Sequence, residues 1–402
     1  MQYKNVMQSK NTSIELYKII LNTYLIPQKL NPLAARLIFN YSPKPDECLP
    51  PMKPIKLSLT ALLAAFALHA TAQTSNDSVS SKSERALPEW FPQISGTIRG
   101  KMEYQTNEKE GRFEVRTARI AFDGRIVPMV EYKAEIDLSD EGKIKMLDAY
   151  AGVLPLKGMN LRLGQMRVPF SIDAHRSPHK QYFANRSFIA KQVGNVRDVG
   201  FYAAYHCQRI PLSIEAGVFN GSGLTNQKDY WTKEFNYSAK LQYKLPLGFT
   251  LQASVQKLNP SGISTYLYDG GITFQHGRFT AECEYLRKHY NHGAFSDVNA
   301  LDAFVSYDQP LRRVFQKVSF LCRYDRMDNH SDGTLNDEGT AMKLTDAARQ
   351  RVTGGITLSF AKKMNADIRL NYEKYFYDNI ELAKPSERDK AVIELVIHFP
   401  NK

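Results

Sequence analysis

Apolar and polar residues alternate along most of the chain after residue 92, which is the pattern of strands with one apolar and one polar face. In the segment 235–245 the odd-numbered residues are apolar or aromatic, and the even-numbered ones are Asn, Ser, Lys, Gln and Lys. A change of phase near Thr117 indicates a β-bulge. The pattern predicts sixteen strands, at 94–104, 112–125, 128–138, 144–154, 159–168, 197–206, 211–220, 235–245, 248–258, 266–276, 278–288, 298–308, 313–325, 350–361, 365–377 and 389–399.

The connections between these strands alternate between short and long. Seven are tight turns rich in Pro and Gly, and eight are longer loops, of which the third long one, residues 169–196 (loop 169–196 below), is the longest. Outer-membrane barrels have short turns on the periplasmic side and long loops outside, whereas a soluble sandwich does not separate its loops by length. The order therefore predicts a barrel with both ends of the chain on the periplasmic side.

The polar faces of these strands carry charges of both signs, and burying unpaired charges costs several kcal/mol each. The polar face must therefore meet water and the apolar face lipid. A barrel of sixteen strands is wide enough for an aqueous channel. We predict an all-β protein, a transmembrane antiparallel up-and-down β-barrel of sixteen strands in the outer membrane, with loop 169–196 folded into its lumen.

The N-terminal part of the chain carries a targeting signal. Residues 52–72 have a basic head with Lys53 and Lys56, an apolar middle and an Ala70-Thr71-Ala72 cleavage site, which together form a secretory signal peptide. We expect residues 1–51 to be a leader or a spurious extension, with Met52 as the start. Residues 73–91 are rich in Ser and charge and are expected to form a flexible periplasmic tail, followed by the barrel at 92–402.

Charge is concentrated in loop 169–196. The whole chain has a formal net charge of +12, and four cations of the loop stand against Asp173 alone. Basic rings select anions, and the planar fork of Arg suits phosphate. The candidate anion-binding residues of the constriction are Arg176, Lys180, Arg186 and Lys191, with His175 and His179 able to add charge below neutral pH.

Further cations fall on the polar faces of the predicted strands. Acids share those faces, so the wall is mixed in charge. The candidates for the lumen wall are Arg99, Lys101, Lys133, Arg162, Lys240, Lys244, Lys317, Arg323 and Arg369. The alternative for all these charges is that they are merely solvated or paired across the lumen.

Five segments carry a family resemblance. They are RFEVRTARIAFDG (112–124), LDAYAGV (147–153), LRLGQMRVPFS (161–171), VRDVGFYAAY (196–205) and AGVFNGSG (216–223). In order and spacing they resemble the phosphate-selective porin O/P family across residues 94–245, most specifically at Gly164–Phe170. The resemblance implies a homotrimeric sixteen-stranded anion channel with its third outer loop folded inward. The chain departs from the usual C-terminal aromatic of such barrels, because three residues follow Phe399.

The leading hypothesis is a porin, a passive channel for small anions. Phosphate or polyphosphate is its narrower form, and we expect the barrel to meet outer-membrane lipid and lipopolysaccharide and to be inserted by the barrel-assembly machinery. One alternative is a plugged structural or adhesin barrel. Another is a barrel-embedded hydrolase that uses His175 and Ser177, although that pair lies in a loop rather than on a rigid strand. The sequence has no motif for a metal, a cofactor or nucleic acid, so we predict none and expect no enzyme activity.

Overall fold

The computed structural model describes residues 90–400 except 141, 193–195, 225–226 and 361–364. The predicted signal peptide and leader lie outside these residues. The described residues form sixteen strands, each within two residues of its predicted ends: β1 (Gln93–Gln105), β2 (Gly111–Val127), β3 (Val130–Asp140), β4 (Lys143–Val153), β5 (Met159–Arg167), β6 (Arg197–His206), β7 (Leu212–Phe219), β8 (Asn236–Lys244), β9 (Phe249–Leu258), β10 (Thr265–His276), β11 (Phe279–Tyr290), β12 (Val298–Pro310), β13 (Phe315–Met327), β14 (Arg349–Phe360), β15 (Ala366–Tyr377) and β16 (Lys390–Pro400).

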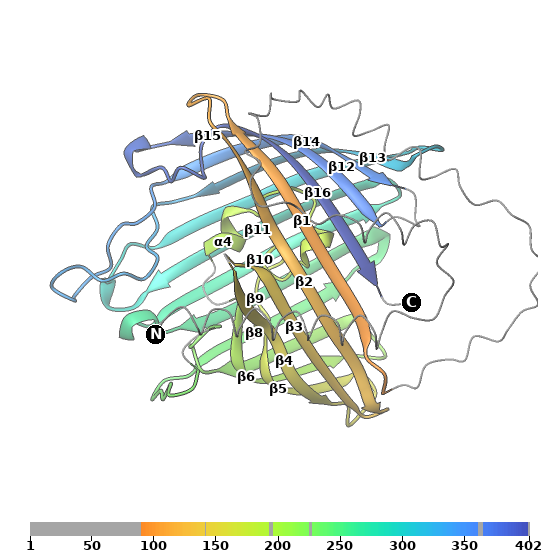
Figure 1. The fold of residues 1–402 in the computed structure, drawn as a ribbon. Coiled ribbons are helices and arrows are strands. Elements are labelled where there is room, and N and C mark those ends of the chain that lie inside the picture. Colours follow the sequence, from red (N-terminus) through yellow and green to blue (C-terminus); the bar gives the residue numbers. More distant parts are fainter. Residues whose placement is uncertain (1–89, 141, 193–195, 225–226, 361–364, 401–402) are drawn as a thin grey trace, which may run out of the picture. The chain divides into compact units, whose positions relative to one another are not determined.

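The strands close into a barrel (Figure 1). Each pairs antiparallel with its neighbours in sequence, and β1 also pairs with β16 from Ser95↔Pro400 to Gln105↔Lys390. The predicted up-and-down barrel is therefore confirmed. Helix within the described residues is limited to α4 (Phe188–Gln192) and to 3₁₀ turns at Pro178–Lys180, Pro246–Gly248, Pro260–Gly262, Asn291–Gly293 and Ile380–Leu382. Among these described helices, none has the length and apolar character to cross a membrane.

Side chains alternate between the lumen and the outside of the barrel, as the sequence pattern requires. On β8, Tyr237 is 49% exposed on the outer surface, while Lys240 is 7% exposed on the inner one. Exposed Leu, Ile, Val, Phe and Tyr recur on the outer face of nearly every strand. The outer surface is therefore apolar and suited to lipid, and the charged residues point inward.

Among the irregularities of the strands, three on β2, β4 and β5 bear on the lumen. Arg116 is an extra residue between Val115 and Thr117, because Arg99 pairs with Thr117 and Gly100 with Val115. This bulge confirms the phase change expected near Thr117. Leu147 is likewise an extra residue on β4, opposite the step from Glu135 to Ile136.

The third break is at Gly164 on β5, which has φ +132°. A Cβ there would lie 2.3 Å from the carbonyl oxygen of Ala149, so the position requires glycine. Beyond it, the consecutive residues Gln165 and Met166 are both 2% exposed, which strict alternation does not allow.

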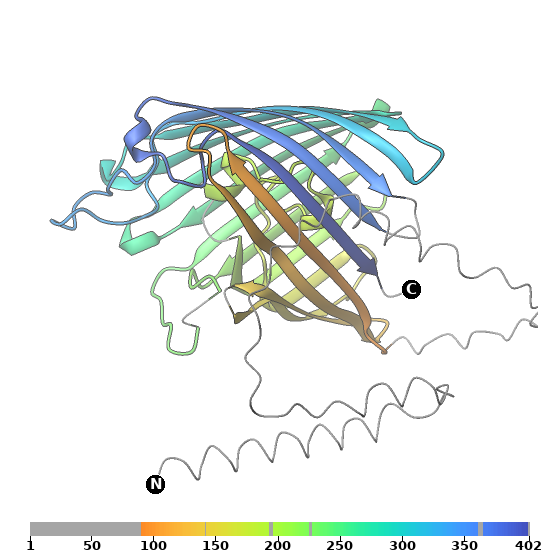
Figure 2. The ribbon, with the colours of Figure 1, turned by 45° about the horizontal axis from the view of Figure 1, so that its top comes forward.

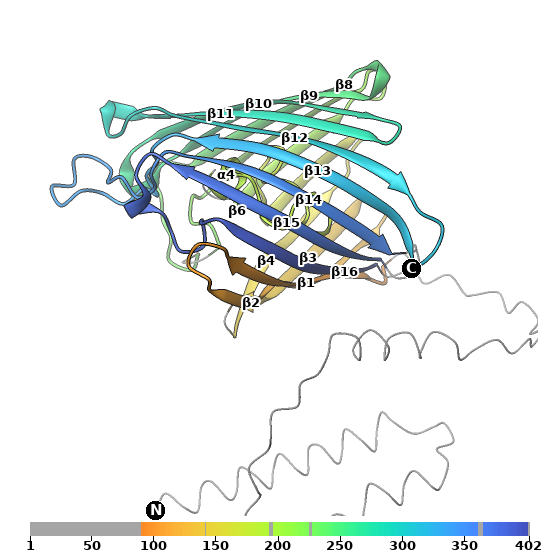
Figure 3. The same ribbon diagram turned by 90° about the horizontal axis from the view of Figure 1, so that it is seen from above.

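Loop 169–196 lies inside the barrel, as predicted. Figures 1 and 3 show α4 within the ring of strands, and Figure 2 shows the same segment enclosed from a third direction. Phe188 and Ile189 of α4 are fully buried in an apolar cluster with inward residues of β11, β12, β13 and β15. The loop thus fills one side of the lumen and leaves space along the other.

Candidate functional site

The first leg of loop 169–196 is bound to β11. Glu284 accepts hydrogen bonds from the Ser171 hydroxyl (2.5 Å), the Ile172 amide (2.7 Å) and the Asp173 amide (3.2 Å). The Ser171 amide also donates to the hydroxyl of Ser254 on β9 (3.1 Å). Backbone amides held by a buried carboxylate fix the path of this leg across the lumen.

Arg176 joins the loop to the same wall. Its guanidinium donates two hydrogen bonds to Glu282 on β11, at 2.7 and 2.8 Å, and one to Asp173 at 3.0 Å. It also lies over the rings of Tyr182 and Phe304. Arg176, predicted to bind anions, is therefore engaged as a structural ion pair.

The second leg of the loop is held by four of the predicted wall cations. Arg99 donates to the Gln181 side chain and to the Ala184 carbonyl, both at 2.7 Å. The other three bonds run from Lys101 to the Asn185 side chain (3.1 Å), from Arg323 to the Asn185 carbonyl (3.0 Å) and from Arg369 to the His179 carbonyl (3.2 Å). These cations position the loop, and their charges are directed into it.

Two cavities lie between the loop and the wall formed by β1 to β6. The outer cavity, of about 830 Å³, is lined near the long loops by Arg112 and Lys145. The inner cavity, of about 330 Å³, extends to Ser95 and His398 near the chain ends. Both are lined by Arg119 of β2 and Pro178 of the loop, so the two cavities adjoin at these residues, and the two together are called the passage below.

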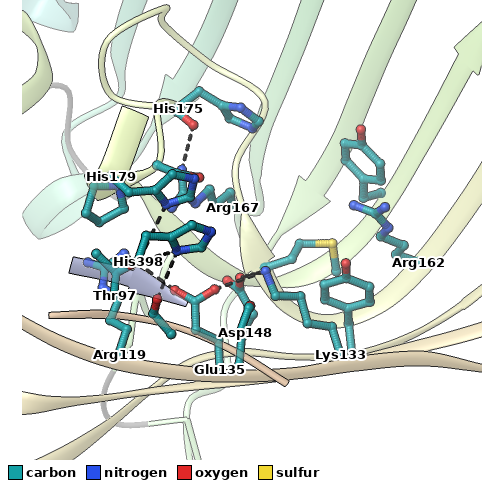
Figure 4. A pocket seen from close by; sticks show the side chains of 18 residues that line it. Thr97, Arg119, Lys133, Glu135, Asp148, Arg162, Arg167, His175, His179 and His398 are labelled. Atoms are coloured by element: carbon teal, nitrogen blue, oxygen red, sulfur yellow. Dashed lines mark hydrogen bonds and ion pairs between the residues drawn. The ribbon is translucent and has the colours of Figure 1, made fainter. Parts of the chain in front are cut away.

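The lining of this passage is basic. Figure 4 shows Arg119, Lys133, Glu135 and Asp148 of the wall facing Arg167 and the loop histidines across the inner cavity. The two cavities are lined by four carboxylates, Glu114, Glu135, Asp137 and Asp148. They are also lined by ten cations, namely Arg99, Arg112, Arg116, Arg119, Lys133, Lys145, Arg162, Arg167, Arg186 and Arg197.

Several of these cations are tied to the acids of the same wall. Arg119 pairs with Asp137 (2.9 Å), Arg197 with Asp148 (2.7 Å), and Lys133 with Asp148 (3.2 Å). Arg162 pairs with Glu131 (2.8 Å) and contacts two tyrosine rings. The wall is thus partly neutralised, and the excess positive charge comes from the remaining cations.

Arg167 and Arg186 differ from their neighbours. Among the described residues, neither has a carboxylate within ion-pair distance: Arg167 donates to the carbonyl of His175 (2.5 Å), and Arg186 donates to the carbonyls of Asp173 and Ala174 and, at 2.8 Å, to that of Arg176. A guanidinium that bonds only neutral carbonyls keeps its full charge and further N–H donors for an anion. Arg186 was among the predicted residues, whereas Arg167 was not.

The other predicted residues lie away from this passage or are engaged elsewhere. Lys180 and Lys244 are exposed. Three of the lysines pair with acids, namely Lys191 with Glu387 (3.1 Å), Lys240 with Glu215 (2.8 Å) and Lys317 with Asp308 (2.5 Å). Burial lowers the pKa of Lys191 to about 8, although Glu387 opposes the shift.

The two loop histidines line the inner cavity. His179 stacks on His398 of β16, with ring centroids 3.8 Å apart. Burial, with smaller effects from His398 and neighbouring cations, lowers the pKa of His179 to about 4, and burial lowers the pKa of His175 well below its usual value. Both rings are therefore neutral at and just below neutral pH, and the passage draws its charge from Arg and Lys.

The chain is similar to one known protein family and to several solved structures. Residues 97–291, which span β1 to β11, match the family model described as phosphate-selective porin O and P. No curated protein matches the chain. Similar solved structures include OmpF of Salmonella typhi in complex with daunomycin (TM-score 0.55, 12% identity), an anion-selective porin from Comamonas acidovorans (0.53, 11%) and the trimer form of OmpT from Vibrio cholerae (0.51, 12%).

Each of these three similarities covers 76% of this chain, and 97%, 98% and 98% of the other chain in the same order. At these identities they show the shared barrel fold. The family match over residues 97–291 confirms the resemblance drawn from the sequence, and the protein is an outer-membrane porin.

Proposed function

We propose that this porin conducts small anions along the passage between loop 169–196 and the wall of β1 to β6. The observation that carries the proposal is the charge around the two cavities, where ten lining cations stand against four lining carboxylates and three further ones, Glu394, Glu103 and Glu131, that pair with Arg99, Arg112 and Arg162. Such an excess lowers the electrostatic energy of an anion in the passage and raises that of a cation. The similarity to an anion-selective porin supports the same reading.

We further propose phosphate as a permeant anion. The support is chemical: most of the lining cations are arginines, whose planar fork donates two hydrogen bonds to a phosphate, and the matching family is described as phosphate-selective. The guanidinium groups are spread along the passage rather than gathered in one cage. An anion can therefore move between weak sites, as conduction requires.

The test is the zero-current potential of the refolded protein in a planar bilayer under a KCl gradient, with and without phosphate. Wild type is expected to give the sign of an anion-selective channel and to lose chloride current when phosphate is added. Arg167→Gln removes a charge about 4 Å from a passing ion, which is ~1 kcal/mol in water for each ion and of opposite sign for the two, so the chloride-over-potassium permeability ratio should fall by roughly 25-fold at most. Arg167→Lys should keep the chloride preference and weaken the phosphate block, because an ammonium lacks the fork.

The matched control is Lys244→Gln, which removes one charge from an exposed lysine at the periplasmic end of β8. Its selectivity should stay close to that of wild type. A cation-selective wild type would contradict the proposal. Anion selectivity without a phosphate block would restrict it to general anions, and equal selectivity of Arg167→Gln and wild type would remove Arg167 from the mechanism.

We also propose that the protein assembles as a homotrimer and is exported by the signal peptide at 52–72. The support for a trimer is the apolar outer surface and the similarity to the trimer form of OmpT. The outward Phe399 at the end of β16 suits recognition by the barrel-assembly machinery, and lipopolysaccharide would meet the long-loop rim. The mass of the native, detergent-solubilised protein tests the first proposal, and a mature chain that begins at Gln73 tests the second.

A further inference from the structure

Four carboxylates gather on the lumen wall behind the first leg of loop 169–196. They belong to Asp269 on β10, Glu282 and Glu284 on β11, and Asp302 on β12, and each residue is at most 6% exposed. Glu284 lies directly opposite Asp302 in the register of β11 and β12. Like charges placed opposite one another across a strand pair repel, so the arrangement needs a compensating charge.

The arginines of this region compensate only part of the charge. Arg176 binds Glu282, and Arg323 reaches Asp302 only at 3.8 Å from its Nε. Asp269 accepts a hydrogen bond from Ser254 (2.9 Å), which carries no charge. Four carboxylates against two guanidinium groups leave two negative charges in a buried place, where unpaired charge costs several kcal/mol.

Unused oxygen atoms point to a missing partner. The Oδ2 atom of Asp269 and the Oδ1 atom of Asp302 are fully buried and have no hydrogen-bond partner among the described residues. Buried polar atoms of native proteins nearly always have a hydrogen-bond partner, and a carboxylate oxygen can accept a hydrogen bond or bind a cation. The oxygens without a hydrogen bond therefore belong to the same cluster of carboxylates that carries the uncompensated negative charge.

Three of the carboxylates are close enough to share one ion. Single carboxylate oxygens of Glu282, Glu284 and Asp302 all lie within 4.8 Å of one another, and ligands on opposite sides of a Ca²⁺ ion are about 4.8 Å apart. Mg²⁺ keeps several water ligands in protein sites, whereas Ca²⁺ takes carboxylates directly, which favours Ca²⁺ in a place this buried. Oxygen-only ligands exclude a preference for soft metals.

We propose that a divalent cation of the calcium class binds between Glu282, Glu284 and Asp302, with Asp269 as a neighbouring charge outside the ligand set. The ion would neutralise the two excess charges. Because Glu284 also holds the Ser171 hydroxyl and the amides of Ile172 and Asp173, the ion would fix the first leg of loop 169–196 to the barrel. This site lies behind the loop and is separate from the anion passage, so it goes beyond the proposed function.

The test is equilibrium dialysis with ⁴⁵Ca²⁺ of the full mature chain, refolded from denaturant, freed of metal with EDTA and kept free of lipopolysaccharide. Wild type is expected to bind about one Ca²⁺ per chain, with Mg²⁺ at least about tenfold weaker as a competitor. Asp302→Asn should weaken Ca²⁺ binding at least about tenfold, since it removes one of three close charged ligands. Asp269→Asn is the second variant, should Asp302→Asn fail to fold.

The matched control is Asp308→Asn, an acid on the same strand that pairs with Lys317 outside the cluster. It should bind Ca²⁺ as wild type does. A folded wild type that binds no Ca²⁺ at millimolar concentration would overturn the proposal, and protons shared between the carboxylates would then explain how their charge is neutralised. Equal Ca²⁺ binding by Asp302→Asn and Asp308→Asn would also overturn it. The measurement does not involve conductance, so its outcome is independent of anion selectivity.

Discussion

Asp173 is the residue whose removal should loosen loop 169–196 most directly. Its carboxylate accepts from Arg176 (3.0 Å) and from the amide and hydroxyl of Ser187, at 3.0 and 2.9 Å. It therefore joins the first leg of the loop to the start of α4, and it is 6% exposed. We predict that Asp173→Asn makes the loop mobile within an otherwise intact barrel, because the strands pair without it.

The magnitude follows from the ionisation of this group. Burial alone would raise the pKa of Asp173, but Arg176 and Arg186 outweigh it and lower the pKa from 3.8 to about 2. Such a shift corresponds to ~2–3 kcal/mol of loop stabilisation by the charged form. Because the folded pKa is the lower one, this stabilisation is complete above about pH 4 and is lost as the pH falls through about 2.

The assay is the current noise of single channels in a planar bilayer at fixed voltage. Wild type should be quiet at pH 7 and become noisy between about pH 4 and pH 2, whereas Asp173→Asn should be noisy already at pH 7. Asp308→Asn is the control and should behave as wild type above pH 4. The reasoning would be refuted by an Asp173→Asn channel as quiet as wild type at pH 7, or by one that gains as much noise as wild type on acidification.

Two further predictions concern the histidines and Gly164. Since burial lowers the pKa of His179 to about 4 and that of His175 well below its usual value, neither ring should gain charge between pH 8 and pH 5, so His179→Gln should show the same pH dependence of ion selectivity as wild type in that range; a rise in anion preference on acidification that His179→Gln abolishes would contradict this assignment. Gly164→Ala should lower the temperature at which the barrel unfolds in detergent, because its Cβ meets a carbonyl oxygen at 2.3 Å, while Gly354→Ala, with no atom within 4 Å of the added Cβ, should not. Equal unfolding temperatures would show that β5 accommodates the methyl group.

The strands could be predicted because each face of a barrel strand meets a different solvent. Alternation is then imposed on every segment, as on β8 with Tyr237 outside and Lys240 inside, and it is visible without any tertiary contact. The inward position of loop 169–196 was expected from the family resemblance, while its length and charge set it apart from the other loops. What could not be predicted is which cations line the passage, since that depends on contacts between segments far apart in the chain.

Three of the six lining cations that were not predicted lie beside breaks in alternation. Arg116 is the extra residue of the bulge on β2, and Lys145 lies two residues before the extra residue Leu147 on β4. Counting from the inward Arg162 by twos places Arg167 outside the barrel, but Gly164 shifts the phase and turns it into the inner cavity. A period of two assigns faces only as far as the next bulge, so the sequence alone could not resolve these positions.

The charge of the loop and the charge of the passage have different sources. Arg176 and Lys191 pair with Glu282 and Glu387, so two of the four loop cations are neutralised, and the loop's polar atoms are largely used to hold it against β9 to β16 and β1. The loop acts mainly by covering the side of the lumen formed by β9 to β16, where wall cations such as Arg323 and Arg369 donate to its backbone. Ions are then left with the side formed by β1 to β6, so we propose that selectivity arises from which wall cations the loop leaves uncovered rather than from the number of charges that the loop carries.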